Sequence, residues 1–79
     1  MPERRIVERH IVTGRVIAVQ EERLRLATDG GQNLLLTLRF DSHLPADLGD
    51  LLYSQAPVRV IYEGEPDMDS GVVRRIERI

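Results

Sequence analysis

The chain has 79 residues, which is enough for one small domain and too few for a second. It contains no cysteine, so neither a disulfide nor a thiolate metal site can stabilise it, and aliphatic side chains must form the core. Its 11 basic and 13 acidic residues give a net charge of -2, which disfavours non-specific binding to nucleic acid or to an anionic membrane.

The N-terminal part of the chain is a charged segment followed by a predicted strand. Residues 1–9 lack a clear hydrophobic period, and we interpret them as a lead-in to a single domain over residues 10–79. Residues 11–19 are rich in β-branched side chains, which favours a strand over a helix. Gly14 would mark a bend in this strand.

Two further strands joined by a hairpin follow. Arginine and leucine alternate over residues 23–26, which predicts the second strand. Residues 28–32 contain Asp-Gly-Gly, and this favours a type I′ turn because that turn needs positive φ. The third strand is predicted over residues 33–40. Its inward face would carry the apolar side chains at even positions, namely Leu34, Leu36, Leu38 and Phe40.

A short helix is predicted after the third strand. Leucines recur over residues 44–54 at the spacing of one helical face, and Asp41 or Ser42 is available to cap the helix. The leucines of this face are Leu44, Leu48, Leu51 and Leu52. Alternation over residues 58–62 then predicts the fourth strand, with Tyr62 pointing inward.

The end of the chain repeats a pattern found near its start. After an acidic loop over residues 63–70, the last strand is predicted from Gly71 to about Ile79. Residues 14–19 and 71–76 both have the form G-x-V-x-x-[V/I]. Apolar residues spaced two and then three apart predict a strand with an inserted residue, and the glycine predicts a close approach of another segment.

The predicted order is three strands, a short helix and two strands, with irregular first and last strands. This order resembles the OB-fold, a five-stranded Greek-key barrel. The resemblance covers residues 10–79 and rests on the element order, the position of the helix and Gly14. It implies an all-β fold, a small β-barrel with one short helix. An SH3-like barrel is the alternative, in which a loop or 3₁₀ turn would replace the helix.

No residue pattern predicts an enzyme, a metal site or a cofactor. Asp41, Ser42 and His43 are the residue types of a hydrolytic triad, but adjacent residues cannot form its line of hydrogen bonds. His10 and His43 lack partners at metal-ligand spacing. The Asp67–Gly71 segment has its glycine one position too early for a calcium loop, so we expect an ordinary acidic turn.

Three arginines predict a face that binds polyanions. The resemblance to the OB-fold implies a ligand across the second and third strands, where Arg23, Arg25 and Arg39 would point outward. Phe40 and Tyr62 would point inward, so no aromatic side chain would stack on bases beside these arginines. The acidic loop, with Glu63, Glu65, Asp67 and Asp69, would also repel phosphate. Weak single-stranded nucleic-acid binding is therefore the alternative function.

Outward aliphatic side chains predict protein contacts. The four in question are Ile17, Leu35, Ile61 and Val72. A contiguous patch of this kind would mark an interface with a protein partner or with a second copy of the chain. We therefore predict a non-enzymatic binding module with no evident small-molecule ligand. No run of about 18 apolar residues occurs, and we expect a soluble, cytoplasmic protein without membrane contact.

Overall fold

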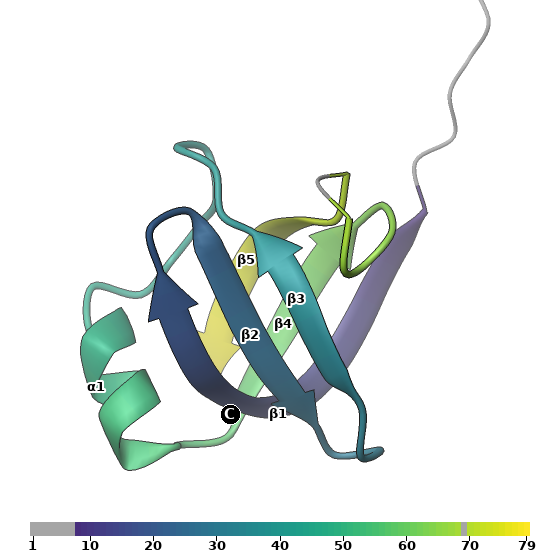
Figure 1. The fold of residues 1–79 in the computed structure, drawn as a ribbon. Helices are drawn as coiled ribbons and strands as arrows, with labels where there is room; N and C mark the ends of the chain where they lie inside the picture. The colour runs from purple at the N-terminus through teal and green to yellow at the C-terminus, as the bar shows by residue number, and fades with distance from the viewer. Residues whose placement is uncertain (1–7, 69) are drawn as a thin grey trace, which may run out of the picture.

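The computed structural model describes residues 8–68 and 70–79, which form a ring of five strands with one short helix (Figure 1). The strands are β1 (Arg9–Gln20), β2 (Arg23–Thr28), β3 (Asn33–Thr37), β4 (Val58–Glu63) and β5 (Val72–Arg78), and helix α1 (Leu48–Ser54) lies between β3 and β4 in the chain. The predicted all-β class and element order are confirmed. In the described part of the chain no helix is long and apolar enough to cross a membrane.

Around the ring the strands follow the order β1-β2-β3-β5-β4, and β4 pairs back onto β1. All neighbouring strands are antiparallel except β3 and β5, which run parallel. The first described strand begins at Arg9, the last residue of the predicted lead-in, whereas residues 1–7 lie outside the described residues.

The repeated pattern marks the same irregularity in both strands. The ladder from β1 to β2 skips Ile17, between Val16 and Ala18. The ladder from β5 to β4 skips Arg74, which is the fourth residue of its repeat, as Ile17 is of the first. The predicted inserted residue is therefore confirmed in each strand. In β1 it lies three residues after Gly14, so the irregularity is not at the glycine itself.

Both glycines of the repeat lie against the backbone of another segment. A Cβ on Gly14 would collide with the carbonyl oxygen of Ala27 in β2, and one on Gly71 would collide with that of Glu65. Neither position has room for a side chain, which explains the glycine that opens each copy of the pattern.

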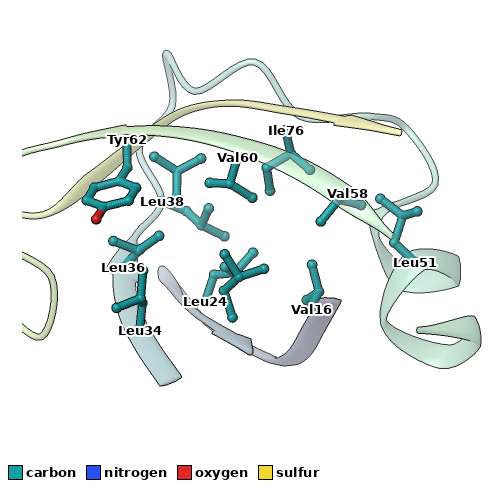
Figure 2. Close-up of a cluster of buried hydrophobic side chains, with 12 residues drawn as sticks. Val16, Leu24, Leu34, Leu36, Leu38, Leu51, Val58, Val60, Tyr62 and Ile76 are labelled. Atoms are coloured by element: carbon teal, nitrogen blue, oxygen red, sulfur yellow. The ribbon is translucent and has the colours of Figure 1, made fainter. Parts of the chain in front are cut away.

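The ring encloses an aliphatic core (Figure 2). Its buried members are Val16, Leu24, Leu26, Leu34, Leu36, Leu38, Leu51, Val58, Val60, Tyr62, Val73 and Ile76. The inward positions predicted for the second, third and fourth strands are confirmed except for Phe40, and Val19 is only partly buried against this core. Burial of each large aliphatic side chain stabilises the fold by about 1.5–3 kcal/mol.

Phe40 was predicted to join the core but is fully exposed. β3 ends at Thr37, and Leu38 is the last inward residue, with its amide donating to the Glu22 carbonyl at 2.7 Å. The chain then turns, because the Ser42 amide donates to the Arg39 carbonyl at 2.9 Å. Strand alternation therefore no longer applies at Phe40.

β3 and β5 pair in parallel along a short line, which we call the seam, and backbone hydrogen bonds from the loop before α1 extend the pairing along β5. The Thr37 amide donates to the Gly71 carbonyl at 2.7 Å. Further along β5, the His43 amide donates to the Arg74 carbonyl at 2.9 Å, and the His43 carbonyl accepts from Ile76 at 3.0 Å. The corner before the helix thus acts as a short continuation of the sheet, and little free strand edge remains at this seam.

The helix begins later than predicted. α1 starts at Leu48, and Pro45 disfavours helical backbone at the preceding Leu44. Asp47 therefore occupies the N-cap position in place of the predicted Asp41 or Ser42, and its side chain makes no capping bond. Leu51 is buried in the core, and Leu48 and Leu52 pack against it as expected, whereas Leu44 is 37% exposed and is not among the residues that pack against the core.

The β2–β3 hairpin is present but its turn type is not the predicted one. Four residues connect β2 to β3, and the Thr28 amide donates to the Gln32 carbonyl at 2.8 Å. Only Gly31 in this connection has positive φ, at 87°. A two-residue type I′ turn would need positive φ at both central positions.

Candidate binding surfaces

An open groove of about 810 Å³ lies where the β1–β2 turn, the end of β3 and the start of α1 meet. We call it the Phe40 groove. Its lining residues are Val19, Glu21, Glu22, Arg23, Thr37, Leu38, Arg39, Phe40, Leu44 and Leu48. In Figure 1 these segments lie at the end of the ring where the β1–β2 turn and the loop after β3 project.

The apolar part of the groove combines partly covered aliphatic side chains with one exposed aromatic ring. Val19 and Leu48 pack against the core from the groove side, and Leu44 lies beside them. Phe40 is fully exposed on the turn that follows β3. An exposed phenylalanine next to other apolar side chains in a groove is typical of a contact surface, whereas a single exposed leucine is not.

The charged part of the groove is balanced. Glu21 and Glu22 come from the β1–β2 turn, and Arg23 and Arg39 come from the strand ends, so the formal charges cancel. Glu21 has a positive φ of 55°, which is unusual for a residue with a side chain. The groove therefore presents both signs of charge around its apolar part.

The structure brings two of the three predicted arginines together at this groove. Arg23 and Arg39 both line it, and Arg25 is the next outward residue along β2. The guanidinium groups of Arg25 and Arg39 have no ion-pair partner among the described residues. The expectation that no aromatic side chain lies near these arginines is wrong, because Phe40 lies in the same groove.

Of the acidic residues predicted near this face, Asp67 lies against β3, whereas Glu63 ends β4 and pairs with Arg74. Besides Glu21 and Glu22 in the groove, the β4–β5 loop contacts β3 through Asp67. The Asp67 carboxylate accepts from the Leu35 amide at 2.9 Å, and its own amide donates to the Leu35 carbonyl at 2.7 Å. Asp69, also expected in this loop, lies outside the described residues.

The four predicted interface residues do not form one surface. Val72 is only 8% exposed, because it lies in the seam, paired with Thr37 on one side and with Glu63 on the other. The expectation that Val72 points to solvent is therefore wrong. The other three, Ile17, Leu35 and Ile61, are half-buried.

Leu35 and Ile61 have different surroundings. Leu35 lies on β3, where it pairs with Arg25 of β2. β3 is not a neighbour of β4 in the ring. Ile61 pairs with Ile11, which is 63% exposed, so an apolar pair lies on the β1–β4 ladder. Leu35 and Ile61 therefore lie on strands that β5 separates.

The triad-like residues have structural roles. The Ser42 hydroxyl donates to the Val73 carbonyl and accepts from the Arg39 amide at 3.0 Å, so it fastens the corner to β5. Asp41 accepts from Arg74 at 3.2 Å. Within residues 8–68 and 70–79 no group of three histidine, aspartate or glutamate side chains is placed to hold a metal ion.

Tyr62 is buried in the core and also contacts the imidazole ring of His10. Its ring stacks on the imidazole of His10, its partner on β1, with centroids 5.0 Å apart. Burial raises the pKa of the Tyr62 hydroxyl, and the nearby Glu65 carboxylate raises it further. The inward direction predicted for Tyr62 is confirmed, and the contact with His10 was not predicted.

No protein-family model, no curated protein and no solved structure matches this chain significantly.

Proposed function

We propose that this chain is a non-enzymatic binding module that contacts a protein through the Phe40 groove. The observation that carries this proposal is the fully exposed ring of Phe40 beside the partly covered Leu44 and Leu48. The proposal includes an OB-like architecture, supported by the ring order of the strands and the parallel pairing of β3 with β5. A cytoplasmic location belongs to the same proposal.

The physical argument is the free energy available when the ring is covered. Removal of a phenylalanine side chain from water contributes about 1.5–3 kcal/mol. Aromatic anchors surrounded by polar residues dominate many protein interfaces. Phe40 with Glu21, Glu22, Arg23 and Arg39 around it has this composition.

A protein ligand fits the charges of the groove better than a polyanion does. Two glutamates and two arginines line it, and both signs would find partners on a protein surface. A phosphate chain would meet Glu21 and Glu22 at the same place. A second copy of this chain is one form of the protein ligand.

A selection experiment tests the proposal. Random peptides displayed on phage are selected on the parent protein and then challenged with the Phe40→Ser variant. Tyr53→Ser is the matched control, because Tyr53 is a 92% exposed aromatic residue on α1 that does not line the groove. We expect enriched peptides with apolar anchors that bind the parent and Tyr53→Ser but not Phe40→Ser.

Two results would contradict the proposal. One is that no peptide is enriched and that sedimentation equilibrium finds no self-association of the parent at high micromolar concentration. The other is that Phe40→Ser retains the peptides or the self-association of the parent.

One observation favours a second candidate function. Phe40 lies in the same groove as Arg23 and Arg39, and aromatic rings beside arginines are the usual elements of single-strand binding. Weak single-stranded nucleic-acid binding by Arg23, Arg25 and Arg39 therefore remains the alternative, and an oligonucleotide titration tests it below.

A further inference from the structure

A second hollow of about 460 Å³ lies beside the start of β1, the bulge of β5 and the corner before α1. We call it the cationic hollow. Its lining residues are Arg9, Asp41, His43, Ile61, Arg74 and Arg75. Three arginines and one aspartate give the lining a formal charge of +2, and the carboxylates of Glu63 and Glu77 contact these arginines from outside the lining.

One of these arginines is firmly held. The Arg74 Nε lies 2.9 Å from a carboxylate oxygen of Glu63, and its Nη2 lies 3.2 Å from one of Asp41. Arg74 is the inserted residue of β5, so the bulge places its side chain between these two carboxylates. Its guanidinium is therefore oriented before any ligand arrives.

The other two arginines are loosely paired. Arg9 lies 3.9 Å from Glu63, whose other oxygen is already bound to Arg74, and Arg75 lies 3.9 Å from Glu77. Their side chains are 65% and 57% exposed. Exposed ion pairs at such distances contribute little, so Arg9 and Arg75 can exchange these partners for a ligand.

An apolar wall adjoins the cations. Ile61 lines the hollow, and its ladder partners are Ile11 on β1 and Arg75 on β5. A ligand held by Arg75 would therefore have an isoleucine beside it, against which an apolar group could pack. Inorganic phosphate alone would leave this wall uncovered.

We infer that the cationic hollow binds a small phosphomonoester. Guanidinium groups bind phosphoryl oxygens in pairs of charge-assisted hydrogen bonds, which Arg9 and Arg75 would supply. The organic part of the ligand would lie on Ile61. This site is separate from the Phe40 groove, and it does not depend on the proposed protein contact.

The test titrates phenyl phosphate and inorganic phosphate into ¹⁵N-labelled protein at constant ionic strength, with sodium chloride as the balancing salt. We expect saturable amide shifts near residues 9–11, 41–43 and 74–76, and tighter binding of phenyl phosphate than of inorganic phosphate. Arg9→Gln and Arg75→Gln should each weaken binding about tenfold, because each removes a charge-assisted contact. Ile61→Ser should remove the advantage of phenyl phosphate.

Two further variants keep the test decisive. Asp41→Asn removes the carboxylate that lines the hollow and should strengthen binding, which loss of folding would not do. Arg15→Gln makes the same change in net charge at an exposed position of β1, outside the hollow, and should leave the affinity unchanged. The inference is overturned if shifts do not saturate, if chloride produces them equally, if Arg15→Gln weakens binding as much as Arg75→Gln, or if inorganic phosphate binds as tightly as phenyl phosphate.

Discussion

The Arg78 guanidinium at the end of β5 binds the Asp47 carboxylate at the start of α1. Its Nε donates to Asp47 at 2.9 Å and its Nη2 bonds to the same oxygen, while Nη2 also lies 3.0 Å from Asp50. The side-chain hydrogen bond from Arg78 lowers the pKa of Asp47 below its ordinary value of 3.8, and the charge of Arg78 lowers it further. This contact joins the last strand to the only helix among the described residues.

Acid should weaken the contact between Arg78 and Asp47. Because the pKa of Asp47 is lower in the folded protein than in the unfolded chain, the stabilisation is present above the ordinary value of 3.8 and is lost as pH falls through the folded pKa. Thermal unfolding of the parent and of Arg78→Gln, followed from pH 7 to pH 2, measures this. We expect the stability advantage of the parent to shrink below about pH 4. An advantage that stays constant over this range would show that Asp47 is not the partner that matters.

Replacing the core residue Leu36 of β3 should strongly lower the free energy of unfolding. Leu36 is fully buried, and its replacement by alanine should lower the free energy of unfolding by about 2–5 kcal/mol. Leu35→Ala, one residue away on the half-buried outer face, should cost clearly less. Chemical denaturation of both variants provides the measurement, and equal losses would contradict the assigned direction of the β3 side chains.

Two glycines should respond to alanine with opposite signs. Gly14→Ala places a methyl group against the Ala27 carbonyl and should destabilise the protein, because the two strands would have to separate. Nothing lies within 4 Å of a Cβ on Gly49 in α1, so Gly49→Ala should stabilise by about 0.5–1 kcal/mol through helix propensity. Melting temperatures of both variants test this. A destabilised Gly49→Ala variant would be inconsistent with the described helix.

Nucleic-acid binding should be weak. At physiological salt we expect a Kd above about 1 µM for a labelled single-stranded oligonucleotide, because the net charge of -2 limits counterion release. Fluorescence anisotropy at two salt concentrations is the appropriate assay. Submicromolar binding that falls steeply with salt and is lost in Arg25→Glu would instead make the alternative function the leading one.

The spacing of apolar residues in the sequence correctly predicted those strands in which inward and outward side chains alternate regularly. The inward leucines of β2 and β3 follow strict alternation, and the repeated glycine pattern predicted an inserted residue in each strand, which the structure places at Ile17 and Arg74. These features depend on local backbone geometry, which neighbouring residues specify.

The Phe40 groove lies where the alternation of β3 ends, and the sequence did not predict that end. Phe40 continues the alternation of β3 in the sequence, yet the bond between Ser42 and the distant Val73 helps to hold the chain in a turn around it. Val72 was misassigned for a related reason, because the seam with β3 buries it. Both outcomes rest on contacts between segments about 30 residues apart, which a pattern of neighbouring residues does not report.

The protein contact at the Phe40 groove is tested most directly by calorimetric titration of one enriched peptide into the parent, Phe40→Ser and Tyr53→Ser. Loss of a central aromatic anchor should weaken binding at least about tenfold, whereas Tyr53→Ser should bind like the parent. Peptide binding of equal strength to the parent and to Phe40→Ser would contradict the assignment of the groove as the binding surface.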